Sequence, residues 1–190
     1  MATRSIFALE MCLSFSPKLH QLLHALLNES TQRPLSLQDK WSLYDRASRC
    51  LYSHHQAWHS GCWDFYDDDM RARTDFNMWV NGMLTEEGAR PTPSPPADPY
   101  RGDARFLTFT MAVLMVNGTS SERQLASSLN IPESRLWTRD TFAHVLGATR
   151  LFNFASIEAS TMYLIPNEPG FALMAEDLRH PKFKYLRQIV

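Results

Sequence analysis

Residues 104–116 read Ala-Arg-Phe-Leu-Thr-Phe-Thr-Met-Ala-Val-Leu-Met-Val, the most apolar run in the 190-residue chain. β-branched and aromatic side chains are frequent in this run, and both of its alternating sets are largely apolar. Such a pattern is typical of a central strand that is covered on both faces. The run is also too short and too polar to cross a bilayer. We therefore predict a sheet built around residues 106–116.

The composition describes a folded chain with balanced charge. Hydrophobic residues make up 44% of the sequence, which is enough for a core. Lysine and arginine number 19, aspartate and glutamate number 20, and the formal net charge is −1. A chain balanced in this way has no overall attraction to nucleic acid or to anionic membranes. A nucleic-acid function would therefore need a local basic face.

The cysteines are sparse and odd in number. Cys12, Cys50 and Cys62 fit free thiols in a reducing compartment. The apolar run that follows Arg4 is interrupted by Glu10, and no small-residue cleavage site follows it, so we expect no signal peptide. The sequence therefore predicts a cytoplasmic protein that does not insert into membranes.

The first part of the chain predicts one strand and then helices. Residues 6–15 alternate, which indicates a half-buried strand. Leucines at helical spacing predict a helix over about 17–28. Ser36 begins a capping-box pattern, and the apolar stripe beyond it predicts a long helix over about 37–60. A further helix is expected over about 70–84.

Five prolines between residues 88 and 103 indicate an extended linker. Residues 1–87 then form a part with one strand and helices, 88–104 form the linker, and 105–190 form an α+β part that shares one core with the first. We predict an α+β fold in which a small mixed or antiparallel sheet packs against helices. The alternative is a helical N-terminal part followed by a C-terminal winged helix.

That alternative comes from residues 121–146, whose pattern is typical of a helix-turn-helix. A helix to about Leu129 and a second helix from about Glu133 would be joined by a turn at Asn130, and 157–172 would form a wing hairpin. The side chains that would face DNA are Arg135, Thr138, Arg139 and His144.

Two features of the sequence weigh against DNA binding. The second helix has Arg139-Asp140 where it needs another core residue, and 106–116 would have to be a helix rather than a strand. From residue 101 to the end there are ten basic and eight acidic side chains, which is weak for a protein that binds phosphates.

A metal site is a further hypothesis. On the predicted long helix, His55, His59 and Cys62 fall on one face at spacings of four and three residues, and imidazole and thiolate are good zinc ligands. The favoured interpretation is a buried stripe in which His55 and Cys62 accompany Leu51 and Trp58. We therefore predict no cofactor.

An aromatic and acidic segment is the preferred candidate for contacts with other proteins. Clustered carboxylates also suit hard cations, but no glycine is spaced as in a calcium loop, so a solvated or docking loop is favoured. The predicted interaction residues are Trp63, Phe65, Tyr66, Asp67, Asp68 and Asp69.

The order of elements and several short motifs resemble a known family. The motifs are Leu129-Asn130-Ile131-Pro132, Leu164-Ile165-Pro166, Ala175-Glu176-Asp177-Leu178 and His180-Pro181-Lys182-Phe183. Together they resemble the domain of unknown function 1517, an uncharacterised family found in cyanobacteria and chloroplasts. These motifs are structural, so the resemblance implies no catalytic residue.

The function predicted from sequence is therefore non-enzymatic. No Ser-His-Asp order, Gly-x-Ser-x-Gly, phosphate loop or dinucleotide fingerprint is present. Nine methionines and five tryptophans suit a scaffold or assembly component that acts through protein partners or self-association. A winged-helix DNA-binding regulator and a zinc-dependent site are the second and third hypotheses.

Overall fold

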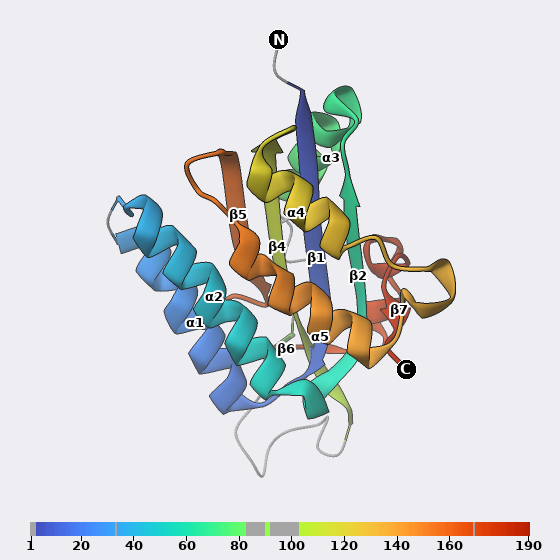
Figure 1. The fold of residues 1–190 in the computed structure, drawn as a ribbon. Helices are drawn as coiled ribbons and strands as arrows, with labels where there is room; N and C mark the ends of the chain where they lie inside the picture. Colours follow the sequence, from blue (N-terminus) through green and yellow to red (C-terminus); the bar gives the residue numbers. More distant parts are fainter. Residues whose placement is uncertain (1–2, 33, 83–89, 92–102, 169) are drawn as a thin grey trace.

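The computed structural model of the protein describes residues 3–32, 34–82, 90–91, 103–168 and 170–190. An antiparallel sheet lies at the centre and helices cover it (Figure 1), which confirms the predicted α+β fold. The helices are α1 (Pro17–Gln32), α2 (Leu37–Ser53), α3 (Asp69–Gly82), α4 (Ser120–Ser128) and α5 (Arg139–Ala148). The strands are β1 (Arg4–Ser14), β2 (Trp58–Tyr66), β3 (Arg90–Pro91), β4 (Arg105–Val116), β5 (Ile157–Ile165), β6 (Phe171–Met174) and β7 (Arg187–Gln188).

The strands β1 and β4 pair along their whole lengths, from Arg4 opposite Val116 to Ser14 opposite Phe106. The other edge of β1 pairs with β2, which in turn pairs with β7. The other edge of β4 pairs with β5 and, at its start, with β6, which also pairs with β3. Both parts of the chain thus contribute strands to one sheet, so the alternative of a separate C-terminal winged helix is wrong.

Both faces of β1 are covered, although its alternation predicts a half-buried strand. On the first face, Phe7, Leu9 and Met11 belong to the core formed with α1, α2, α4 and α5, which lie together in Figure 1. On the second face, Ile6 and Ala8 pack with residues of α3. The polar members of the alternation therefore lie beneath α3 and the C-terminal segment rather than in water.

The helix predicted over 37–60 ends earlier, at Ser53. Its start is as expected, because Ser36 and Asp39 form a capping box. After one turn of 3-10 helix the chain becomes β2, whose residue Trp58 lies opposite Leu13 of β1. Pairing with β1 thus outweighs a helical pattern that continues in the sequence beyond the true end of the helix.

The helix-turn-helix geometry predicted for 121–146 is also wrong. The helix α5 begins at Arg139, six residues later than expected, because Thr138 caps it and Glu133–Arg135 form a separate 3-10 turn. Strands β5 and β6 each pair with β4, so 157–172 is not a wing hairpin. Residues 106–116, which the winged-helix alternative would require to be a helix, form part of β4, as their pattern predicts.

Most of the linker predicted at 88–104 lies outside the described residues. The described part comprises Arg90–Pro91, which pair with β6, and residues 103–104, which precede β4. Among the residues that the structure describes, no helix is both long enough and apolar enough to span a membrane.

Candidate functional site

A row of polar side chains crosses the second face of the sheet. Glu10 on β1 lies opposite Cys62 on β2 and opposite Thr110 on β4, and Thr110 lies opposite Tyr163 on β5. Because directly paired residues point to the same face, these four side chains form one line across four strands. The strand register therefore places a carboxyl group in the middle of the sheet.

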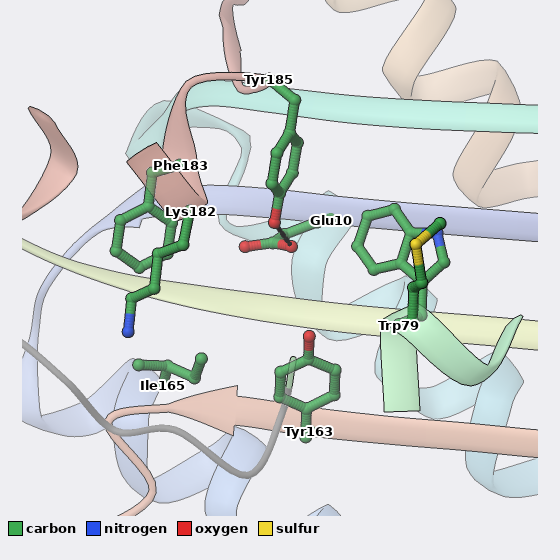
Figure 2. Close-up of a pocket in the computed structure, with 8 residues that line it drawn as sticks. Glu10, Trp79, Tyr163, Ile165, Lys182, Phe183 and Tyr185 are labelled. Carbon is green, nitrogen blue, oxygen red and sulfur yellow. Dashed lines mark hydrogen bonds between the residues drawn. The ribbon is translucent and has the colours of Figure 1, made fainter. Parts of the chain in front are cut away.

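This carboxyl group lies at the floor of a cavity of about 360 Å³. Its walls come from three separate parts of the chain: α3, the end of β5 and the C-terminal segment 181–186 (Figure 2). The lining residues are Glu10, Met78, Trp79, Tyr163, Ile165, Lys182, Phe183 and Tyr185. We refer to this cavity as the Glu10 pocket.

Glu10 is 1% exposed and makes a short hydrogen bond. The hydroxyl of Tyr185 donates to its Oε2 atom at 2.6 Å, the contact dashed in Figure 2. Burial raises the pKa of Glu10 from 4.5 to about 7, and the hydrogen bond from Tyr185 opposes this rise. At neutral pH the carboxyl group is therefore present in both its charged and its neutral form.

Two further hydroxyl groups lie beside this carboxyl. Thr108 and Thr110 are 0% exposed. Hydrogen bonds from both to Glu10 oppose the rise in its pKa that burial causes, which places their hydroxyls next to the carboxyl although neither makes a well-formed bond. The floor of the pocket is therefore a cluster of buried hydroxyl groups around one carboxyl, joined to it by weak hydrogen bonds.

The walls are mainly aromatic. The rings of Trp79 and Tyr185 meet edge to face, with centroids 5.7 Å apart. Figure 2 shows the hydroxyl of Tyr163 directed toward Glu10 from β5. Burial, followed by the negative charge of Glu10, raises the pKa of both Tyr163 and Tyr185, so both phenols keep their protons and act as donors.

The thiols near the pocket are unsuited to nucleophilic chemistry. Burial raises the pKa of Cys12 and of Cys62 to about 12. Because the thiolate is the reactive form, both cysteines are inert at neutral pH. The groups at the floor are thus suited to hydrogen bonding and to holding charge.

Few features of the sequence indicate this site. Glu10 interrupts an apolar alternation at a position that normally faces solvent, and Tyr163, Lys182 and Tyr185 share no motif with it. The only signal was a carboxylate within a strand. The site forms only through the pairing of β1 with β4 and the return of the C-terminal segment, since Tyr185 lies 175 positions after Glu10 in the chain.

The predicted interaction residues do not form one loop. Trp63, Phe65 and Tyr66 belong to β2, the first two pack against the core, and the indole nitrogen of Trp63 donates to the Leu136 carbonyl at 3.1 Å. Tyr66 donates to Asp75 and lies beneath the Arg71 guanidinium. Asp67 and Asp68 are exposed, and Asp69 begins α3.

The residues predicted to face DNA mainly support the fold. Arg139 donates to the carbonyls of His55 and Trp58, at 2.7 and 3.2 Å. Thr138 caps α5, and the Nε2 atom of His144 lies 2.8 Å from the Ser128 carbonyl. Arg135 is exposed in the 3-10 turn.

The predicted metal ligands do not share a helix face. His55 lies in the 3-10 turn after α2, whereas His59 and Cys62 lie on β2. In the described ranges, no group of three or more His, Cys, Asp or Glu side chains is placed to hold a metal ion. The helical spacing on which this hypothesis depended is wrong because α2 ends at Ser53.

Comparison with known proteins adds no functional information. No protein-family model, curated protein or solved structure matches the chain. The resemblance to the domain of unknown function 1517 stays a prediction, and the function has to be argued from the chemistry of the Glu10 pocket.

Proposed function

We propose that this protein binds a small organic molecule in the Glu10 pocket. The observation that carries the proposal is a fully buried carboxyl group at the floor of an aromatic-walled cavity, with one complete hydrogen bond. Ligand pockets are typically about 300–1,000 Å³, largely apolar and equipped with a few convergent polar groups. The Glu10 pocket has this size and this distribution of groups.

The cost of burying Glu10 supports a functional role. A carboxyl group taken out of water destabilises the fold unless hydrogen bonds or a counter-charge compensate it. The equivalent neighbours on the same face of β1, Ala8 and Cys12, are buried without such a cost. Groups that reduce stability and have perturbed pKa values cluster at functional sites, because binding needs them.

A fragment screen with matched blocking variants tests this proposal. Saturation-transfer NMR would detect binding of small aromatic amines, alcohols, amides and carboxylates. Met78 lines the pocket and is 59% exposed, so Met78→Trp should fill the cavity with little effect on folding. Met70 lies on the same helix, is 81% exposed and does not line the pocket, so Met70→Trp is the control.

We expect at least one fragment class to bind the native protein and the Met70→Trp variant, and to lose binding in the Met78→Trp variant. Equal binding to both variants would place the fragments elsewhere on the surface. If none of the fragment classes binds the native protein at millimolar concentration, the proposed function is wrong.

The protein-contact function remains a second proposal. Asp67 and Asp68 are exposed between β2 and α3, and Met70 beside them is highly exposed, which suits a docking surface. Light scattering across a concentration series tests self-association, which Asp67→Asn with Asp68→Asn should weaken. The cytoplasmic location is also a proposal, supported by three free cysteines.

A further inference from the structure

We infer that the ligand of the Glu10 pocket is an organic cation, an amine or quaternary ammonium with an apolar body, whose positive charge contacts the Glu10 carboxylate. This inference rests on the proposed function and specifies its ligand class. It combines three features of the pocket: the groups around the carboxyl, the aromatic walls and the position of Lys182.

The groups around Glu10 are suited to its ionised form. Tyr185 donates to the carboxyl, and the hydroxyls of Thr108 and Thr110 lie beside it on the adjoining strand. Hydroxyl donors stabilise a carboxylate, because the charged form accepts hydrogen bonds with both oxygens. A buried carboxylate also needs a positive charge nearby, and a cationic ligand would provide it.

The walls provide the other half of a cation site. Trp79, Phe183 and the two tyrosines surround the space in front of the carboxyl (Figure 2). Aromatic faces attract alkylammonium groups, tryptophan most strongly, and they attract them more when the site excludes water. The same rings provide an apolar surface for the body of the ligand.

Lys182 contributes a cation to the lining of the pocket. Its ammonium group lies 5.0 Å from the centre of the Phe183 ring. Figure 2 shows this group directed toward the side of Ile165 and away from Glu10. Of the influences on the pKa of Glu10, the charge of Lys182 is the smallest. The Lys182 ammonium therefore compensates the carboxylate only in part, and a cationic ligand would add to this compensation.

Binding of a cation should depend on pH through Glu10. The ligand selects the ionised carboxyl, so its affinity should fall about tenfold per pH unit below the pKa and level off above it. Binding should also release protons near neutral pH, since it favours ionisation of Glu10. Among the described residues, the titratable groups that face Glu10 are Cys12 on its own strand and, from other elements, Lys182, Tyr185, Tyr163 and Cys62. The helix α3 contributes Met78 and Trp79 to the described lining.

Calorimetry with three probes of similar shape tests the ligand class. The probes are benzyltrimethylammonium, benzyl alcohol and benzoate, measured on the full chain at about pH 8.5 and about pH 5.5, on either side of the pKa of Glu10. We expect the cation to bind at least about tenfold more tightly than the alcohol at the higher pH. Most of this preference should disappear at the lower pH. Titrations in buffers of different ionisation enthalpy should show proton release at about pH 7.

Variants test whether the Glu10 carboxylate causes the preference for the cation. Glu10→Gln should remove both the preference for the cation and its pH dependence, while Glu168→Gln, at an exposed acid, should change neither. Lys182→Gln should strengthen binding of the cation several-fold, because it removes a like charge. If Glu10→Gln does not fold, the calorimetry of the native protein at the two pH values still shows whether binding of the cation depends on the ionised carboxyl.

Two outcomes overturn the inference in different ways. If benzyl alcohol or benzoate binds as tightly as the cation at about pH 8.5, the ligand class is wrong while the proposed function stands. If none of the three probes binds and the fragment screen is also negative, both proposals fail. Weaker binding of the cation to Lys182→Gln would also contradict the inference, because the ligand would then need a positive group in the pocket.

Discussion

At the scale of the single residue, Glu10 couples the stability of the fold to pH. Its pKa is about 7 in the folded protein and 4.5 in its ordinary state. Between these values the folded state holds more protons than the unfolded state, so stability falls as pH rises from about 4.5 to about 7. The shift corresponds to an effect on the order of 3 kcal/mol.

Glu10→Gln should therefore remove this pH dependence. Relative to the native protein, we expect the variant to gain stability progressively between about pH 5 and about pH 8, by up to about 3 kcal/mol. Urea unfolding of both proteins across that range measures the difference. A constant difference between the two proteins would mean that the carboxyl titrates as an ordinary surface acid.

A second prediction at this scale concerns Gly61, which lies on β2 where α5 crosses the sheet. An added Cβ atom would lie 2.5 Å from Cε1 of Phe142 and 3.0 Å from the carbonyl oxygen of Glu10. Since neither neighbour has space to move freely, Gly61→Ala should destabilise the protein by about 2 kcal/mol. Gly147→Ala is the control, because no atom lies within 4 Å and alanine favours the helix.

Urea or thermal unfolding compares these two alanine variants directly. We expect Gly147→Ala to be neutral or to stabilise by up to about 1 kcal/mol. If Gly61→Ala were equally neutral, α5 would lie farther from the sheet than described. The core between the sheet and α1, α2, α4 and α5 would then be less tightly packed.

At the scale of the element, the N-terminus of α5 is a junction of three segments. The Arg139 guanidinium donates to two carbonyls of the connection between α2 and β2, and its backbone nitrogen donates to the carbonyl of Val190. Arg139→Lys keeps the charge but loses the planar fork, so we expect a loss of about 1 kcal/mol. Arg135→Lys, at an exposed residue of the connection between α4 and α5, should change stability by less than about 0.5 kcal/mol.

Chemical denaturation of the two lysine variants is the measurement. Similar losses in both would contradict this role of Arg139 and would favour a general effect of replacing arginine. A loss confined to Arg139→Lys would confirm that the residue predicted to face DNA supports the fold instead.

The elements also show what the sequence predicts well and what it does not. The central strand at 106–116 is evident because both of its alternating sets are apolar. The end of α2 is not, because His55, Trp58 and Cys62 continue a helical spacing while their actual environment is set by pairing with β1. Local patterns predict local structure, and they fail where a distant strand determines the conformation.

The same reasoning explains why the candidate site was missed. The alternation of its own strand places Glu10 on the side that faces solvent, whereas the pocket around it is assembled from α3, β5 and the C-terminal segment. Trp79, Tyr163 and Tyr185 are each unremarkable in sequence. They form one site only through contacts between residues that lie far apart in the chain.

At the scale of the whole molecule, the complete pairing of β1 with β4 should make the two parts of the chain unfold together. Register partners such as Leu9 and Met111 are about a hundred residues apart and are both buried. Neither strand retains its partner if one part unfolds alone, so no stable half should remain. We expect a single cooperative transition in urea.

Two probes with different locations test this cooperativity. Tryptophan fluorescence samples Trp41 on α2 and Trp79 on α3, which cover opposite faces of the sheet, whereas far-UV circular dichroism follows all helices. Coincident curves are expected, and hydrogen exchange should be slowest in the amides of β1 and β4. Two separate transitions, or slow exchange confined to one half, would mean that the parts fold independently. In that case the Glu10 pocket, which requires both parts, would form only when they dock.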